Sequence, residues 1–122
     1  MQSKITTGEM PVALNGVDLV LKPTLRAMTQ ISRQYGGLGK ARSELVAENF
    51  DAIVFILRVG TGMSDRDARD LGDRVYANGI TAELLVPLIK YVAVLGNGGK
   101  PLDDEPVDAP AGDDAEAGAG NF

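Results

Sequence analysis

Apolar residues on both sides of one turn dipeptide mark the N-terminal part of the chain. Apolar residues flank Asn15-Gly16 within residues 10–22, and Asn-Gly is the dipeptide that most readily takes the positive φ values of a two-residue hairpin turn. The pattern predicts strands at about 11–14 and 17–22. An isolated hairpin is only marginally stable in water, so we expect helices to cover its apolar face. That face comprises Val12, Leu14, Leu19 and Leu21.

Residues 23–60 show helical spacing. Pro23-Thr24 ends the second strand and opens a helix, because proline is tolerated at a helix start, and Gly36-Gly37 ends this helix. Residues 38–48 predict a short, weakly amphipathic helix. Residues 49–60 are apolar nearly all round, which predicts a buried central helix, with a strand as the alternative because β-branched residues are frequent there. The apolar positions of the first helix are Leu25, Met28, Ile31 and Tyr35.

Two further helices are expected after residue 63. Ser64-Asp-Arg-Asp67 has the Ser-x-x-acid form of a helix N-terminus and predicts a surface helix that ends near Asn78-Gly79. Its alternating Arg and Asp residues indicate a solvated face with ion pairs that each contribute roughly 0.3–0.5 kcal/mol. Thr81 caps a last helix with a wide apolar stripe, and Pro87 either kinks or restarts it. The stripe comprises Leu84, Leu85, Leu88, Ile89, Val92 and Leu95.

These elements predict one domain of the α+β class, mostly α, in which an N-terminal two-stranded β-hairpin packs on a bundle of four to five helices. We expect the domain to cover residues 1–99 and residues 100–122 to form a disordered acidic tail. Of the 12 Lys and Arg residues and the 17 Asp and Glu residues of the chain, eleven and ten lie in residues 1–99. The domain is therefore nearly neutral, while the tail is acidic.

The residue inventory narrows the chemistry. The chain contains no histidine and no cysteine, so it lacks the side chain most often used for proton transfer near neutral pH and cannot form a thiolate metal site or a disulfide. The other residues show no recognisable catalytic arrangement, and Asp103-Asp104-Glu105 lacks the spaced ligands of a calcium loop. We therefore expect a non-enzymatic protein without a cofactor or a metal ion.

Charge and hydropathy argue against two further kinds of partner. The sequence has no basic stripe for phosphate contacts, which disfavours nucleic-acid binding. The longest unbroken apolar run, residues 52–57, is far too short to span a membrane, and the N-terminus lacks the apolar segment of a signal peptide. We expect a soluble, cytoplasmic protein that does not bind membranes.

Two blocks carry a resemblance to a known family. The first, residues 21–38, reads Leu-Lys-Pro-Thr-Leu-Arg-Ala-Met-Thr-Gln-Ile-Ser-Arg-Gln-Tyr-Gly-Gly-Leu, and the second combines residues 75–80 with residues 87–99. In this order they resemble phage tail assembly chaperones of the gene-transfer-agent type, over about residues 5–99. The resemblance implies a small, mostly helical assembly factor that coats the tape measure protein and keeps it soluble until tail tube subunits polymerise around it. It also implies action in the cytoplasm of a bacterial host cell and absence from the mature particle.

The expected contact surface is the last helix and the start of the tail, because a wide apolar stripe is followed there at once by an acidic segment. The tape measure protein is the expected partner and the tail tube protein a second candidate, while homo-oligomerisation stays open. We expect deletion of residues 100–122 to weaken binding of the tape measure protein. The candidate contact residues are Leu88, Val92, Leu95, Asp103, Asp104 and Glu105.

Two other functions stay open at the level of sequence. A structural tail tube subunit of a phage or gene transfer agent would be β-rich and would form rings through continuous sheets, whereas two strands at most are predicted here. A small transcription regulator would use the helix pair that follows Ser64, but its binding to DNA would require a basic surface.

Overall fold

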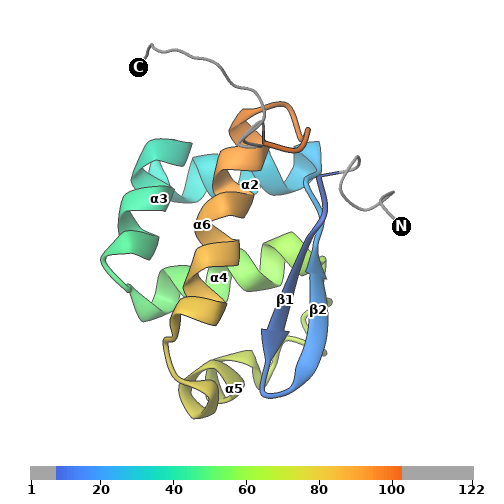
Figure 1. Cartoon of the computed structure of the whole chain (residues 1–122), viewed down its shortest axis with the longest axis vertical. Coiled ribbons are helices and arrows are strands. Elements are labelled where there is room, and N and C mark those ends of the chain that lie inside the picture. The colour runs from blue at the N-terminus through green and yellow to red at the C-terminus, as the bar shows by residue number, and fades with distance from the viewer. Residues whose placement is uncertain (1–7, 103–122) are drawn as a thin grey trace, which may run out of the picture.

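A two-stranded antiparallel hairpin and five helices make up the part of the chain that the structure, a computed structural model, describes, residues 8–102 (Figure 1). The predicted fold class, α+β and mostly α, is confirmed. The predicted tail falls largely outside the described residues. The elements are β1 (Met10–Leu14), β2 (Val17–Leu21), α2 (Leu25–Tyr35), α3 (Leu38–Val46), α4 (Phe50–Thr61), α5 (Leu71–Asn78) and α6 (Ala82–Gly96).

The hairpin forms around the predicted turn. Asn15 and Gly16 have φ values of 53° and 76°, as the tight turn between two twisted strands requires, and Leu14 pairs with Val17 beside it. Val12, Leu14 and Leu21 are buried and Leu19 is partly buried against them, so the predicted apolar face is confirmed. The backbone N–H of Asn15 donates to Oδ1 of Asn78 at 3.0 Å, which ties the turn to the end of α5.

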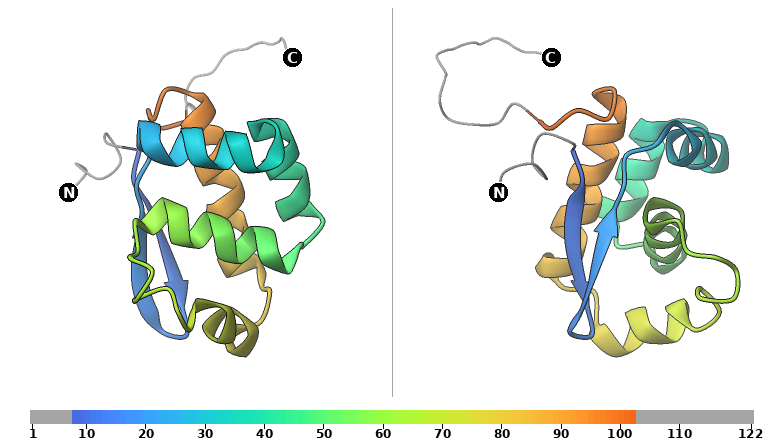
Figure 2. Two further views of the ribbon diagram at one scale, coloured as in Figure 1. Left: turned by 180° about the vertical axis from the view of Figure 1, so that it is seen from behind. Right: turned by 90° about the vertical axis from the view of Figure 1, so that its right-hand side faces the viewer.

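The helices cover the inner face of the hairpin from several directions. α6 packs against β1, α3 and α4, while α4 also contacts β2 and α2. Figures 1 and 2 show the hairpin along one side of the helices, with α5 at the end of the domain that holds the hairpin turn. The C-terminal end of α6 lies at the opposite end (Figure 1). None of the helices within residues 8–102 is both long and apolar enough to cross a membrane.

Two hydrogen bonds of the Lys22 backbone fix the end of β2 between α4 and α6. The backbone N–H of Lys22 donates to the carbonyl of Gly60 at 2.8 Å, and the hydroxyl of Tyr91 donates to the carbonyl of Lys22 at 2.6 Å. A Cβ at Gly60 would lie 2.7 Å from Cδ2 of Leu21. Glycine therefore permits the close approach of α4 to β2. Burial raises the pKa of the Tyr91 hydroxyl.

The apolar stripe of α6 belongs to the core of the domain. Leu88, Val92 and Leu95 have exposed fractions of 0%, 3% and 2%, so these three residues do not form an exposed contact face in the folded domain. α6 is covered by β1 on one side and by α3 and α4 on others. The apolar stripe is wide because it packs against several elements of the same domain. This corrects the expectation that the stripe faces a partner.

Two local predictions about the helices are wrong. Ser64 Oγ accepts from the N–H of Asp67 at 3.1 Å, as a capping residue does, but the following residues form turns and α5 begins at Leu71. A helix in a small domain is stabilised mainly by a buried face, and residues 65–70 supply only the partly buried Ala68.

In α2, Leu25 is 79% exposed and Ala27 is buried in its place. α6 continues through Pro87 without restarting.

Candidate functional site

A groove between α3 and α6 is the candidate site at the end of the domain where α6 terminates. Its volume is about 430 Å³, within the range of pockets that hold a small ligand or a few side chains. The lining is apolar apart from Arg42 and Lys90. The lining residues are Leu38, Gly39, Arg42, Ile89, Lys90, Val92, Ala93, Gly96 and Leu102.

Small residues keep this groove open. No atom lies within 4 Å of the position that a Cβ would take at Gly39, and the nearest atom to a Cβ at Gly96 would be Cδ1 of Leu38 at 3.5 Å. Ala93 is exposed on the α6 side. Because these three positions carry no bulky side chain, the space between α3 and α6 is not filled at the surface, although the two helices pack together in the core. Another chain can therefore approach the backbone of both helices closely.

The chain turns back toward this groove after α6. Gly98 and Gly99 have φ values of 74° and 78°, which glycine adopts without strain. Nδ2 of Asn97 donates to the carbonyl oxygens of Lys100 and Pro101, each at 3.2 Å. The turn brings Leu102, which is half-buried, into the lining of the groove.

A second groove lies between the start of α2 and the end of α4, with a volume of about 620 Å³. Lys22, Arg26 and Arg58 line it together with several hydroxyl groups, and Asp65 is the carboxylate among its lining residues. Residues 19–43 contain five basic residues and no acidic one, so the positive charge extends along α2 beyond the groove. The groove attracts anions, but few large apolar side chains line it that could anchor a partner.

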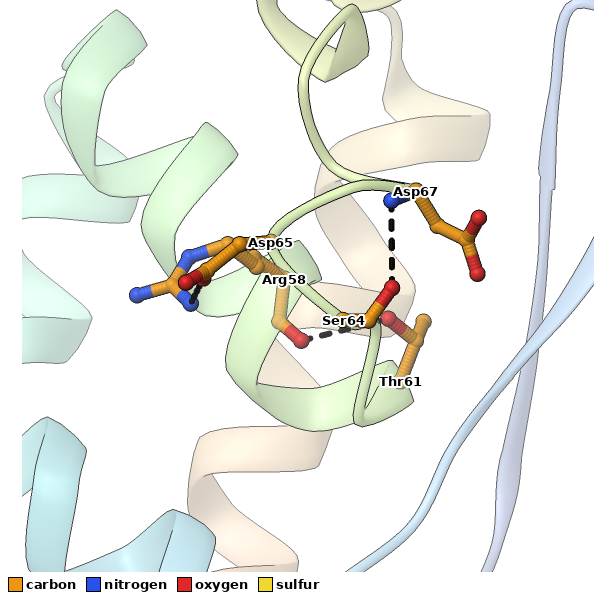
Figure 3. A network of polar contacts seen from close by, with 5 residues as sticks. All are labelled: Arg58, Thr61, Ser64, Asp65 and Asp67. Carbon is orange, nitrogen blue, oxygen red and sulfur yellow. Dashed lines mark hydrogen bonds and ion pairs between the residues drawn. The ribbon is translucent and has the colours of Figure 1, made fainter.

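The groups at the α4 side of the second groove are engaged in local contacts (Figure 3). The guanidinium of Arg58 lies 3.6 Å from a carboxylate oxygen of Asp65, which is fully exposed, and 5.7 Å from the centre of the Phe55 ring. The hydroxyl of Thr61 donates to the carbonyl of Leu57 at 2.7 Å. Such an exposed ion pair is weak, so an anionic partner would displace Asp65 easily.

The titratable groups of the described residues do not form a reactive cluster. The buried hydroxyl of Tyr91 is used in its bond to Lys22. Burial, and to a smaller extent the negative charges of Glu44 and Asp51, raise the pKa of Tyr35. Within residues 8–102, no group of three or more acidic side chains is placed to hold a metal ion.

The structure brings together only part of the predicted contact surface. Val92 lies at the base of the α3/α6 groove, whereas Leu88 and Leu95 pack elsewhere in the core. Asp103, Asp104 and Glu105 lie outside the described residues, immediately after Leu102. Sequence reasoning did not identify α3 as one side of the groove. The available signal was the small residues at position 39 and at positions 93 and 96, the last two of which lie in the apolar segment 84–96.

Comparison of the chain with protein-family models, with curated proteins and with solved structures gives no match.

Proposed function

We propose that this protein is a non-enzymatic tail assembly chaperone that binds the tape measure protein and keeps it soluble in the cytoplasm of a bacterial host cell during tail morphogenesis. The resemblance of residues 21–38, 75–80 and 87–99 to that family supports the proposal. The observation that carries it is the exposed groove between α3 and α6, which is lined by apolar and small residues.

The groove suits an amphipathic helix of the tape measure protein. Gly39, Ala93 and Gly96 allow the partner backbone to come close, and Ile89 supplies apolar surface, as in other complexes of a helix in a groove. Arg42 and Lys90 at the rim favour segments in which acidic residues flank the apolar ones. The groove thus has an apolar centre and a basic rim.

Weak individual binding is appropriate for this task. A short groove buries little apolar area, so one copy binds with modest affinity. Several copies on one long partner cover its apolar stretches together, yet each copy remains displaceable when tail tube subunits arrive. The tail tube protein is therefore a second, later partner of the same assembly.

The two alternative functions have less support. A tail tube subunit would supply long strands for a continuous sheet, but the described part of the chain holds two strands of five residues each. A transcription regulator would need an exposed, basic recognition helix. α6 instead buries most of its large side chains in the core.

Co-expression with the tape measure protein encoded nearby tests the proposal. We expect the tape measure protein to become soluble and to co-purify with this chain. Ala93→Arg, which fills the groove, should weaken co-purification roughly tenfold, about 1.4 kcal/mol of binding free energy. Ala77→Arg on α5 is the matched control because Ala77 is also an exposed helical alanine at the opposite end of the domain.

Two results would contradict the proposal in different ways. A tape measure protein that stays insoluble with the wild-type chain would refute the chaperone function. Equal binding by Ala93→Arg and Ala77→Arg would keep the function but place the contact outside the groove. Both variants should retain the helical content of the wild type, because arginine is nearly as good a helix former as alanine.

A further inference from the structure

The acidic C-terminal segment of this chain leaves the described domain inside the α3/α6 groove. Leu102, the last described residue, lines the groove together with Arg42 and Lys90. The bonds from Asn97 to the carbonyl oxygens of Lys100 and Pro101 hold the chain in this direction. The described part of the chain therefore ends in this groove.

The charges of the groove and of the segment are complementary. Asp103, Asp104 and Glu105 follow Leu102 directly. Within residues 8–102, no carboxylate lies within ion-pair distance of Arg42 or Lys90. Two exposed cations at the rim thus face the point from which three consecutive carboxylates emerge.

The spacing of the segment also fits the groove. Each residue of an extended chain advances at most about 3.3–3.6 Å, so the Cα atoms of the three acidic residues stay within about 11 Å of the Cα atom of Leu102. Pro106 restricts the backbone to extended conformations at that point. Val107 is the next large apolar residue after Leu102, which gives the segment one apolar group on each side of its acidic residues.

We propose that residues 103–108 bind in the α3/α6 groove of their own chain, with their carboxylates paired to Arg42 and Lys90 and Val107 against the apolar lining. Because the segment is tethered at Leu102, its effective concentration at the groove is on the order of millimolar. Binding within one chain is therefore favoured over binding to a second copy. The second groove, beside Lys22 and Arg58, carries more positive charge but is not where the chain emerges.

The consequence for function depends on the proposed chaperone activity. A tape measure segment and residues 103–108 would compete for one groove, so the tail would cover the apolar lining until the partner arrives. Asp103, Asp104 and Glu105 would then contact their own domain in the free protein rather than the partner. Deletion of residues 103–122 would strengthen partner binding, the reverse of the outcome expected from sequence alone.

Paramagnetic labelling of the full-length chain tests the docking without any partner. The chain contains no cysteine, so Ala109→Cys supplies a single site for a nitroxide. We expect strong broadening of the amide signals of Gly39, Ala93 and Gly96, and none at Tyr76 on α5. The double variant Arg42→Glu, Lys90→Glu should weaken the broadening to that of a tethered but undocked tail, as should high salt, because exposed ion pairs are screened.

A matched control separates a local effect from a change in net charge. Arg66→Glu, Arg69→Glu changes the net charge equally at two exposed positions beside α5 and should leave the broadening intact. Equal loss in both double variants, no broadening in the parent chain, or broadening centred on Arg26 and Arg58 would each overturn the proposal. So would broadening that passes from labelled chains to isotope-labelled chains lacking the nitroxide, because it would place the segment on a second copy. Since no tape measure protein is present, this result is independent of the chaperone test.

Discussion

Substitution of Gly60 by alanine probes the tightest contact between the hairpin and the helices. A Cβ at this position would lie 2.7 Å from Cδ2 of Leu21 and 3.0 Å from Cε2 of Tyr91, well inside the usual separation of about 3.5–4.0 Å between carbon atoms. Leu21 is fully buried. The Tyr91 hydroxyl donates a hydrogen bond to the Lys22 carbonyl, which holds the Tyr91 ring in place. The added methyl group has no room unless β2 or α6 moves.

Two effects of opposite sign determine the change in the free energy of unfolding. Alanine stabilises a helix interior relative to glycine by about 0.5–1 kcal/mol. Overpacking of a close-packed core costs about 1–3 kcal/mol. The contacted atoms include an aromatic ring rather than the free end of a flexible chain, so we expect overpacking to dominate. The net destabilisation should be about 1 kcal/mol, the difference between these two effects.

Urea unfolding followed by circular dichroism measures this change. For a domain of this size, about 1 kcal/mol corresponds to a melting temperature lower by about 4–8 °C. Gly39→Ala in α3 is the matched control, because no atom lies within 4 Å of the added Cβ, and it should stabilise by up to about 1 kcal/mol. If Gly60→Ala stabilises the domain as much as Gly39→Ala, the packing argument fails.

The remaining predictions concern the same core. Tyr91→Phe removes the bond to the Lys22 carbonyl and should lower the free energy of unfolding by about 1 kcal/mol. Burial raises the pKa of Tyr91 above its ordinary 10.0, so the stabilisation is complete below pH 10.0 and declines above it, where the unfolded chain ionises first. Urea titrations at neutral and alkaline pH should show a smaller alkaline decline for Tyr91→Phe than for the wild type. Leu88→Ala should destabilise the domain by about 2–5 kcal/mol in the same assay. Val86→Ala, at a position that is 45% exposed, should change the stability by less than about 0.5 kcal/mol. Similar small effects of both substitutions would mean that α6 is not buried as described.

Elements that depend on local chemistry could be predicted from the sequence. Asn15-Gly16 specifies a hairpin because few other residues adopt positive φ at both turn positions. Thr24, Asn49 and Thr81 each accept a hydrogen bond from the backbone N–H three residues later, as capping residues do. These signals act within one turn of the chain, so they need no knowledge of the tertiary contacts.

Features that depend on tertiary packing could not be predicted in the same way. Ser64 makes its capping bond, yet no buried face follows it and the helix starts seven residues later, at Leu71. The exposed Leu25 lies on α2 about 120° from the buried Ile31, at 100° per residue, so helical spacing alone did not show which side meets the core. A cap or a spacing identifies a helix, but the neighbouring elements decide which of its faces is buried.

The same reasoning explains why Leu88 and Leu95, predicted as contact residues, lie in the core. A wide stripe of large apolar residues is equally suited to a partner and to the core, and in a small domain the core takes it first, because little else is available to stabilise the fold. The groove left at the surface is lined instead by small residues, Gly39, Ala93 and Gly96, with a basic rim. The proposed chaperone would gain from this division. Its stability depends on core residues, while its affinity for a partner would depend on a small groove that can be filled and vacated without loss of the fold.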